Sequence, residues 1–449
     1  MLRANLFPLL LLAGIVLAVA SCDDDESPNN PVLGTVLDAL SADPEYSTFV
    51  SALETTGLAA TLDIYSNRFT VFAPTNAAFS AAGASIDVLS TDELRQVLQY
   101  HILQGPILRE GAVPAGPSSQ GTLTTNPSDQ SVPVMLDSDG NVIRLDDLAS
   151  TTDGPTEVVN GVYYGIDAVL TPPTVLDRAG MSGNLTTLLA ALERVGLDSL
   201  LGAPGNHTVF APTDAAFTAS GIDLATVSDT DLSQLLRYHV LDAGLPAADI
   251  PAGQSFRTTM STAGPDDAPL SLLLNKAAAL TVNAEATVTA ADQFGTNGVI
   301  HVIDRVLEMQ SVADFLTKAS ALDSLAGLIV AAQLEDDLAG NGPFTVFAPT
   351  NVALADAADT LSTLSPAQVR EVLLYHAAAE NLRSDELTDQ LSIPTLNSGQ
   401  NLTVNLDEND APVLLTSDST LVTFTTTDVQ ATNGVVHLVE GVLLPELED

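Results

Sequence analysis

The chain has 449 residues, enough for about three domains of ordinary size. Its 57 acidic residues against 14 lysines and arginines give a formal net charge of −43, which repels phosphate backbones and excludes a nucleic-acid partner. Hydrophobic residues make up 46% of the chain, which excludes a disordered acidic tail, and a single cysteine excludes a disulfide framework or a cysteine-based zinc cluster.

Residues 1–21 have the pattern of an export signal. Arg3 precedes an apolar run over residues 6–20, which is too short for an ordinary membrane span. The run ends in Val19-Ala20-Ser21-Cys22, which resembles a bacterial lipobox. That resemblance implies cleavage before Cys22 and acylation of its thiol and new amino group. The alternative is a cleaved secretory signal that leaves Cys22 unmodified. Because the only cysteine occupies the position that the motif requires, we expect Cys22 to carry the lipid.

Residues 22–32 are predicted to form an acidic tether. Asp23, Asp24, Asp25 and Glu26 follow the cysteine directly, and two prolines come next, a composition that stays solvated. An acidic run at this place resembles the surface-export signals of Bacteroidetes-type lipoproteins. The resemblance implies an outer-membrane lipoprotein, held to the membrane through its N-terminal lipid, that we expect to be exposed at the cell surface.

Three copies of one unit follow the tether. The sequence TVFAPTNAAF at residues 70–79 recurs with small changes at 208–217 and 345–354, and successive copies are 138 and 137 residues apart. In each copy a Tyr-His pair lies 28 residues after the first phenylalanine, and an Asn-Gly-Val sequence closes the unit. A period of this length is the size of a whole domain. We therefore expect module 1 over 33–171, module 2 over 172–308 and module 3 over 309–446.

These motifs resemble the fasciclin (FAS1) domain over about residues 33–446. The resemblance implies an α+β fold of three tandem modules, each a small β-sandwich or wedge with packed α-helices. Family members are mostly extracellular adhesion or matrix-contact modules, which implies contact without catalysis. Two departures affect local packing: Leu354 replaces the last phenylalanine of the third copy, and Tyr163-Tyr164-Gly165 replaces Ile300-His301-Val302 in the first.

A helix is predicted before each Tyr-His pair. Ser90 with Glu93 has the pattern of a capping box, which Ser228 with Asp231 and Ser365 with Gln368 repeat. Apolar residues follow at helical spacing, and the histidine lies two turns along the same face. We interpret these histidines as neutral, hydrogen-bonded core residues: His101, His239 and His376.

The tyrosine of each pair lies about 100° round the helix from its histidine, so we expect it nearer the surface. These residues are Tyr100, Tyr238 and Tyr375. In animal members of the family a Tyr-His region is implicated in receptor contact. The resemblance therefore leaves a contact role open for the tyrosines beside a structural one.

The Ala-Pro-Thr segments are predicted to join a strand to a helix. Pro74 favours an extended approach, and Thr75 caps a short helix over residues 76–79; Thr213 and Thr350 repeat this arrangement. A polar helix N-terminus is able to bind an anion, but the negative charge of the chain opposes this.

The closing strands alternate, which places Val299, His301 and Ile303 on one face. His437 has the matching place in module 3 and Tyr164 in module 1. Because tyrosine is no equal substitute for a histidine metal ligand, we predict core packing with a polar tip and no repeated metal site. The remaining histidine, His207, has no counterpart in the other modules.

Signatures of catalysis are missing from the sequence. It contains no G-x-S-x-G, phosphate-cradling or dinucleotide-binding motif. Residues 137–141 resemble the start of an EF-hand loop, but Val142 stands where that loop needs glycine, so a hairpin between 132–136 and 142–145 is predicted instead. We expect no enzymatic activity, no cofactor and no metal.

The acidic residues are spread over all three modules, which favours a protein adapted to salty surroundings over a dedicated cation-binding surface. Stability is then predicted to rise up to roughly 1 M salt. The predicted function is adhesion to cells, surfaces or matrix through an extracellular or envelope protein or polysaccharide, with weak contacts added over three modules. Two alternatives remain open, an envelope scaffolding protein that binds neighbouring envelope components and a secreted hydrolase.

Overall fold

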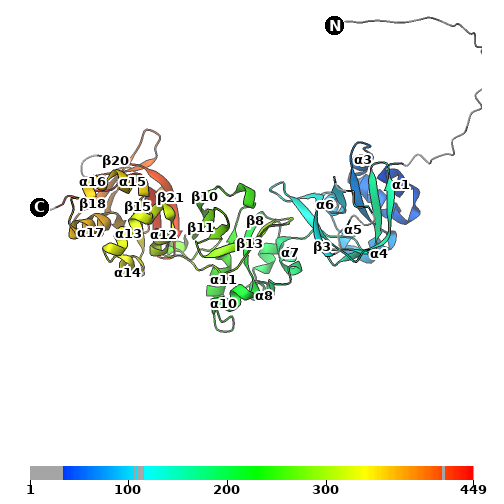
Figure 1. The fold of residues 1–449 in the computed structure, drawn as a ribbon, viewed down its shortest axis with the longest axis horizontal. Coiled ribbons are helices and arrows are strands. Elements are labelled where there is room, and N and C mark those ends of the chain that lie inside the picture. The colour runs from blue at the N-terminus through cyan, green and yellow to red at the C-terminus, as the bar shows by residue number, and fades with distance from the viewer. Residues whose placement is uncertain (1–33, 106, 110–112, 114–115, 417–419, 448–449) are drawn as a thin grey trace, which may run out of the picture.

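A computed structural model describes residues 34–105, 107–109, 113, 116–416 and 420–447. Figure 1 shows three modules in a row, each with its own strands and helices. The expected signal over 1–21, the tether over 22–32 and the lipidation site Cys22 lie outside the described residues. Within the described residues, no helix has both the length and the apolar character needed to cross a membrane.

Module 1 contains short helices packed on one curled sheet. Its helices are α1 (Val36–Ala42), α2 (Ser47–Thr55), α3 (Ala59–Leu62), α4 (Asn76–Ala82), α5 (Ala84–Asp87) and α6 (Thr91–Tyr100). Its strands are β1 (Phe69–Pro74), β2 (Ile102–Gln104), β3 (Gly116–Thr125), β4 (Ser131–Ser138), β5 (Ile143–Leu145), β6 (Ala149–Val158) and β7 (Gly161–Ile166). The strand order is β2-β1-β7-β6-β5-β4-β3.

Module 2 repeats this arrangement. Its helices are α7 (Val175–Met181), α8 (Thr186–Arg194), α9 (Asp198–Gly202), α10 (Asp214–Ser220) and α11 (Asp229–Tyr238). Its strands are β8 (His207–Pro212), β9 (Val240–Leu241), β10 (Gly253–Thr258), β11 (Ser271–Lys276), β12 (Leu280–Val282), β13 (Ala286–Gly295) and β14 (Gly298–Ile303). The strand order, β10-β11-β12-β13-β14-β8-β9, is that of module 1 read from the other edge.

Module 3 differs in that its strands form two separate four-stranded sheets, β16-β15-β22-β21 and β17-β18-β19-β20. Its helices are α12 (Val312–Lys318), α13 (Asp323–Ala331), α14 (Glu335–Leu338), α15 (Asn351–Asp356), α16 (Ala358–Leu361) and α17 (Pro366–Tyr375). Its strands are β15 (Phe344–Pro349), β16 (Ala377–Ala378), β17 (Ser392–Pro394), β18 (Asn401–Leu406), β19 (Pro412–Leu415), β20 (Leu421–Val422), β21 (Phe424–Ala431) and β22 (Gly434–Val439).

A parallel pair of strands lies at the centre of each module. In module 1 the pair joins β1 to β7, with Phe69 opposite Gly161. A Cβ atom on Gly161 would lie 2.0 Å from the carbonyl oxygen of Phe69, so only glycine permits this approach. Gly298 and Gly434 take the same position in the other modules, which explains the glycine of the repeated Asn-Gly-Val sequence.

Each module has two hydrophobic cores, one on each side of the strand that carries the repeated motif. In module 1, Phe69, Val71 and Ala73 of β1 pack with the helices, whereas Phe72 packs with the hairpin strands β4 and β5. Modules 2 and 3 divide their cores in the same way. The predicted α+β class, a wedge of sheet with packed helices, is confirmed.

The predicted local structures are also present. Ser90 and Glu93 form a capping box at the start of α6, as do Ser365 and Gln368 at α17. At α11, Ser228 accepts a hydrogen bond from the N–H of Asp231. The expected hairpin is formed by β4 and β5, with Leu136 opposite Leu145.

Candidate functional site

The histidine of each Tyr-His pair joins the end of its helix to the segment that leaves the module. Nδ1 of His101 lies 2.7 Å from the carbonyl oxygen of Val97, and Nε2 lies 3.0 Å from the N–H of Leu170. His239 and His376 make the same pair of contacts, to Leu235 and Leu307 and to Val372 and Leu443. Because Nε2 accepts a hydrogen bond from a backbone N–H, it carries no proton, and the neutral ring has its proton on Nδ1.

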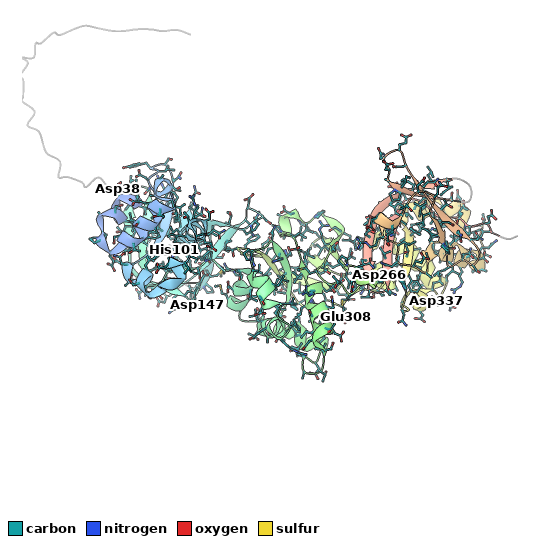
Figure 2. All side chains as sticks on the ribbon, turned by 180° about the vertical axis from the view of Figure 1, so that it is seen from behind. Asp38, His101, Asp147, Asp266, Glu308 and Asp337 are labelled. Atoms are coloured by element: carbon teal, nitrogen blue, oxygen red, sulfur yellow. The ribbon has the colours of Figure 1, made fainter. Side chains whose placement is uncertain are left out.

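Burial keeps these rings neutral over a wide pH range. It lowers the pKa of His101, His239 and His376 to about 4, and the hydrogen bond to the helix carbonyl opposes this only in part. His101 lies inside the first module in Figure 2. Both nitrogens of each ring are occupied, so these histidines have no lone pair to offer a metal or a substrate proton.

The tyrosines lie in the interior, and the expectation that they would be nearer the surface is wrong. Tyr100 and Tyr238 have no exposed surface, and Tyr375 is only 4% exposed. Their helices lie between the two cores of each module, so a face 100° from the histidine is buried as well. Burial raises the pKa of each tyrosine.

The hydroxyl of each tyrosine is bonded to the hairpin strand beneath it. Tyr100 donates to the carbonyl oxygen of Pro133 at 2.9 Å and lies 2.6 Å from Oδ2 of Asp146. Tyr238 donates to Ser271 at 2.9 Å, and Tyr375 donates to Asn401 at 3.1 Å. Each Tyr-His pair therefore ties one helix to both halves of its module.

Each closing strand places one side chain against the carbonyl oxygen of a loop: histidine in modules 2 and 3, and tyrosine in module 1. Nε2 of His301 lies 2.9 Å from the carbonyl oxygen of Leu245, and Nε2 of His437 lies 2.8 Å from that of Leu382. In module 1 the hydroxyl of Tyr164 donates to Leu108 at 2.5 Å. Burial lowers the pKa of His301 and His437. The aromatic rings of the repeated motif lie beside all three, with centroids 5.6–5.7 Å apart: Phe210, Phe347 and Phe72.

The motif threonines act as helix caps. Thr75 accepts the N–H of Ala78, Thr213 that of Ala216 and Thr350 that of Ala353. The first of these helices extends to Ala82, beyond the expected end at residue 79. The three capped helices are short, with 7, 7 and 6 residues.

Two further repeated residues hold each module together, and the sequence interpretation gave them no role. Asn160 accepts the N–H of Val36 at 2.8 Å and donates to the carbonyl oxygen of Leu62 at 2.8 Å; Asn297 and Asn433 repeat this. Thr70 accepts the N–H of Leu108, as Thr208 and Thr345 do at the matching loops. Their presence in all three copies was the available signal.

Within the described residues, no three His, Cys, Asp or Glu side chains gather as a metal site would require. His207 is buried, with Nδ1 3.4 Å from a carboxylate oxygen of Asp242.

A family model described as the fasciclin domain matches residues 44–172, 183–309 and 320–445. The chain belongs to the fasciclin domain family. Each match contains one Ala-Pro-Thr segment, one Tyr-His pair and one closing Asn-Gly-Val strand, so the fasciclin motifs are the buried residues described above.

Known proteins similar to this chain include both animal and bacterial examples. Transforming growth factor-beta-induced protein ig-h3 of Sus scrofa is 26% identical over 299 residues, covering 63% of this chain and 41% of the relative. Protein sll1483 of Synechocystis is 36% identical over 141 residues, covering 30% of this chain and 72% of the relative. The chain thus spans about two fifths of the ig-h3 protein.

A solved structure, a FAS1 domain pair from the insect cell adhesion molecule Fasciclin I, aligns with a TM-score of 0.37 and 19% identity. It covers 57% of this chain and 93% of that structure.

The junction between fasciclin modules 1 and 2 contains a buried arginine. Arg178 on α7 is 5% exposed and donates to the carbonyl oxygen of Pro133 in module 1 at 2.6 Å. Its guanidinium also lies 3.8 Å from Oδ1 of Asp146. Burial raises the pKa of Asp146, although Tyr100 and Arg178 act in the opposite direction. The tyrosine of the Tyr-His motif therefore takes part, through Asp146, in joining two modules.

The junction between modules 2 and 3 is apolar at the same place. Phe315 on α12 packs edge-on against Phe256 with ring centroids 5.8 Å apart, and both belong to a cluster with Leu273. Around them, the N–H of Ser320 donates to Gln254 at 2.7 Å, and Lys318 lies 2.8 Å from Glu285. Phe315 and Arg178 occupy the same position, four residues after the helix cap.

Proposed function

We propose that this chain is a lipid-anchored envelope protein whose three fasciclin modules make non-catalytic contacts with cells, surfaces or matrix. The strongest support is where the repeated polar side chains form their hydrogen bonds. The histidines, tyrosines, threonines and asparagines common to all three modules bond within their own module, as the distances above describe. Recognition is then left to exterior residues, which differ from module to module.

A cleft of about 1000 Å³ between modules 2 and 3 illustrates such a variable exterior. It is lined by hydroxyl and charged side chains, including Arg257, Asp356, Glu440 and the threonines at 425–427. The repeated tyrosines and histidines are not among its described lining residues. The cleft thus combines the cap residue Thr350 with side chains that are not repeated between modules, which favours a binding protein over an enzyme.

Anchoring and display are part of the proposal. The lipobox-like sequence ends at the only cysteine, Cys22, and the acidic tether after it resembles a surface-export signal. Acyl chains at Cys22 would hold the chain to a membrane, because each buried methylene adds about 0.8 kcal/mol. The outer membrane and the outward position are proposed from the acidic run alone. Three modules on one anchored chain combine weak contacts through avidity.

Adhesion is tested in cells that lack the gene and in cells complemented with the wild-type chain or with Cys22→Ser. We expect deletion to reduce cell aggregation and attachment to surfaces, and the Cys22→Ser chain to leave the cells without restoring either. Aggregation and attachment that are unchanged by deletion would contradict the proposal.

Display is tested by treating intact cells with a protease. Release of the modules from intact cells supports an outward position, whereas full protection favours an envelope scaffold that faces the periplasm. Turnover of an ester or glycoside substrate panel by the purified chain would favour a hydrolase.

A further inference from the structure

Both internal junctions use the same two surfaces. The first helix of the following module, α7 or α12, covers the outer face of the hairpin strands of the preceding module. The sheet face contributes the residue that directly follows the second hairpin strand, after Leu145 in module 1 and after Val282 in module 2. That residue is Asp146 in module 1 and Asn283 in module 2, and each accepts the N–H of the neighbouring strand at 2.9 Å.

The matching sheet face of module 3 carries two leucines, one half-buried and one exposed. Val404 pairs with Leu414 as Leu274 pairs with Val282, so Leu415 takes the position of Asn283. Leu415 lies in a cross-strand row with Thr403 and Leu421, and Leu421 is 53% exposed. We call Thr403, Leu415 and Leu421 the tail face; its strands β18 and β20 lie at the end of the row of modules away from module 2 (Figure 1).

The matching helix of module 1 is exposed at the opposite end. Ala39 on α1 takes the position of Arg178 and Phe315, four residues after its cap. Around the start of α1, the N–H of Val159 donates to Gly34, and Asn160 joins Val36 to Ile64. We call Ala39, Ile64, Tyr65 and Val159 the head face. Asp38, beside Ala39, lies at this outer end in Figure 2.

Apolar side chains are exposed on both end faces. Ile64, Tyr65 and Val159 are 42%, 58% and 42% exposed on the head face. In stacked arrays the outermost units normally present polar outer faces, because an apolar end binds another unit. Here apolar side chains are exposed to solvent at both ends, Ile64, Tyr65 and Val159 at one and Leu421 at the other.

The two faces also differ in size in a complementary way. At the internal junctions a large side chain, Arg178 or Phe315, meets a sheet face that offers Asp146 or Asn283. On the tail face the bulk is supplied by Leu415, and the head face offers the small Ala39. We propose that the head face of one copy binds the tail face of a second copy, so that the protein assembles head to tail. Such a contact is heterologous and produces an open row of copies.

Charge sets the condition for this assembly. Asp38 and Asp63 both accept the hydroxyl of Thr35 at the start of α1, and Asp389 accepts the N–H of Leu406 at the end of β18, so carboxylates from two copies would approach each other in the proposed contact. Screening shortens the reach of such repulsion from about 10 Å at 0.1 M salt to about 3 Å at 1 M. Association therefore strengthens as salt is raised.

The test is sedimentation velocity of the full chain carrying Cys22→Ser, which removes the acyl chains, over a concentration series at low and high salt. Leu421→Asp blocks the tail face and Val159→Asp blocks the head face. Each variant alone is expected to associate at least tenfold more weakly than the parent chain, in keeping with the burial of a charge. An equimolar mixture of the two still has one intact head and one intact tail, and is expected to form a dimer and nothing larger.

Val88→Asp, at a 79% exposed position away from both faces, is the matched control and is expected to associate like the parent chain. Tyr65→Asp on the head face and Thr403→Asp on the tail face replace the first pair if either variant fails to fold in a thermal melt. A parent chain that stays monomeric at 1 M salt, blocked variants that assemble like the parent, or a mixture that stays monomeric would each overturn the proposal.

Discussion

The two internal junctions occupy the same place in the fold and use opposite chemistry. Between modules 1 and 2, Arg178 is buried against Pro133 and Asp146. Between modules 2 and 3, Phe315 is buried against Phe256 and Leu273. At each junction a large side chain fills this position. Arg178 lies beside the carboxylate of Asp146, whereas Phe315 packs against Phe256 in a module whose sheet has the uncharged Asn283 in place of that carboxylate.

The largest effect is expected from Phe315→Ala. The ring is 1% exposed and belongs to the helix-side core of module 3, so truncation leaves a cavity and should reduce the free energy of unfolding by about 3–5 kcal/mol. Denaturant unfolding measures this change. Val330→Ala, at a 51% exposed position on α13, is the control and should change it by less than about 0.5 kcal/mol. An equally small loss for Phe315→Ala would mean that the apolar junction contributes little.

Arg178→Leu should cost about 3 kcal/mol, because Asp146 loses its cation while it stays buried and Pro133 loses a donor. Arg178→Phe combined with Asp146→Asn installs the chemistry of the second junction in the first. The double variant is expected to recover at least half of the loss, measured by denaturant unfolding. If it is less stable than Arg178→Leu, the two junctions are not interchangeable versions of one contact.

Acid should destabilise all three modules through one shared histidine, with a further contribution from His301 in module 2 and His437 in module 3, whose pKa is also lowered by burial. The unfolded chain protonates its histidines near pH 6.5, whereas His101, His239 and His376 resist protonation down to about pH 4 when folded. The stability that depends on their neutral state is therefore complete above pH 6.5 and is lost as pH falls towards 4, by roughly 3 kcal/mol for each module.

Unfolding measured at pH 7 and at pH 4.5 tests this dependence. His239→Gln removes one of the buried histidines of module 2 and should weaken the pH dependence of that module alone, because His301 remains. A variant with the full dependence of the parent chain would assign the acid sensitivity to other groups.

The smallest effect is expected from Tyr164→His. His301 and His437 occupy this position in the other modules and bond to the matching carbonyl oxygen, so the exchange should change stability by less than about 1 kcal/mol. Tyr164→Phe keeps the ring and leaves the carbonyl oxygen of Leu108 without this donor, so it should cost more than the histidine exchange. Thermal melts of the two variants test this: a lower melting temperature for Tyr164→His than for Tyr164→Phe would contradict the prediction.

Much of each module follows from local sequence. The cap at Ser90, the cap at Thr75 and the hairpin over 132–145 depend on neighbouring residues, and each forms where the pattern places it. The number of modules follows from three recurrences of one motif, and the fold class follows from the resemblance of those motifs to the fasciclin domain. These features need no knowledge of how distant segments meet.

The errors and omissions arise where packing between segments decides the outcome. Tyr100 was expected near the surface because one buried helix face was assumed, but α6 lies between two cores and buries two faces. Asn160 joins segments almost a hundred residues apart, which no local pattern reveals. The roles of Arg178 and Phe315 depend on the preceding module.

Nuclear magnetic resonance of the six histidine side chains in the full chain, labelled with ¹⁵N, tests most directly whether the repeated motif is internal. Nitrogen shifts recorded from pH 7 to pH 4 report both the tautomer and the protonation of each ring. We predict that the rings of His101, His239 and His376 keep the proton on Nδ1 and titrate only near pH 4. Their nitrogen shifts should not change when zinc is added. Titration of these rings near pH 6.5, or a shift on adding zinc, would contradict it.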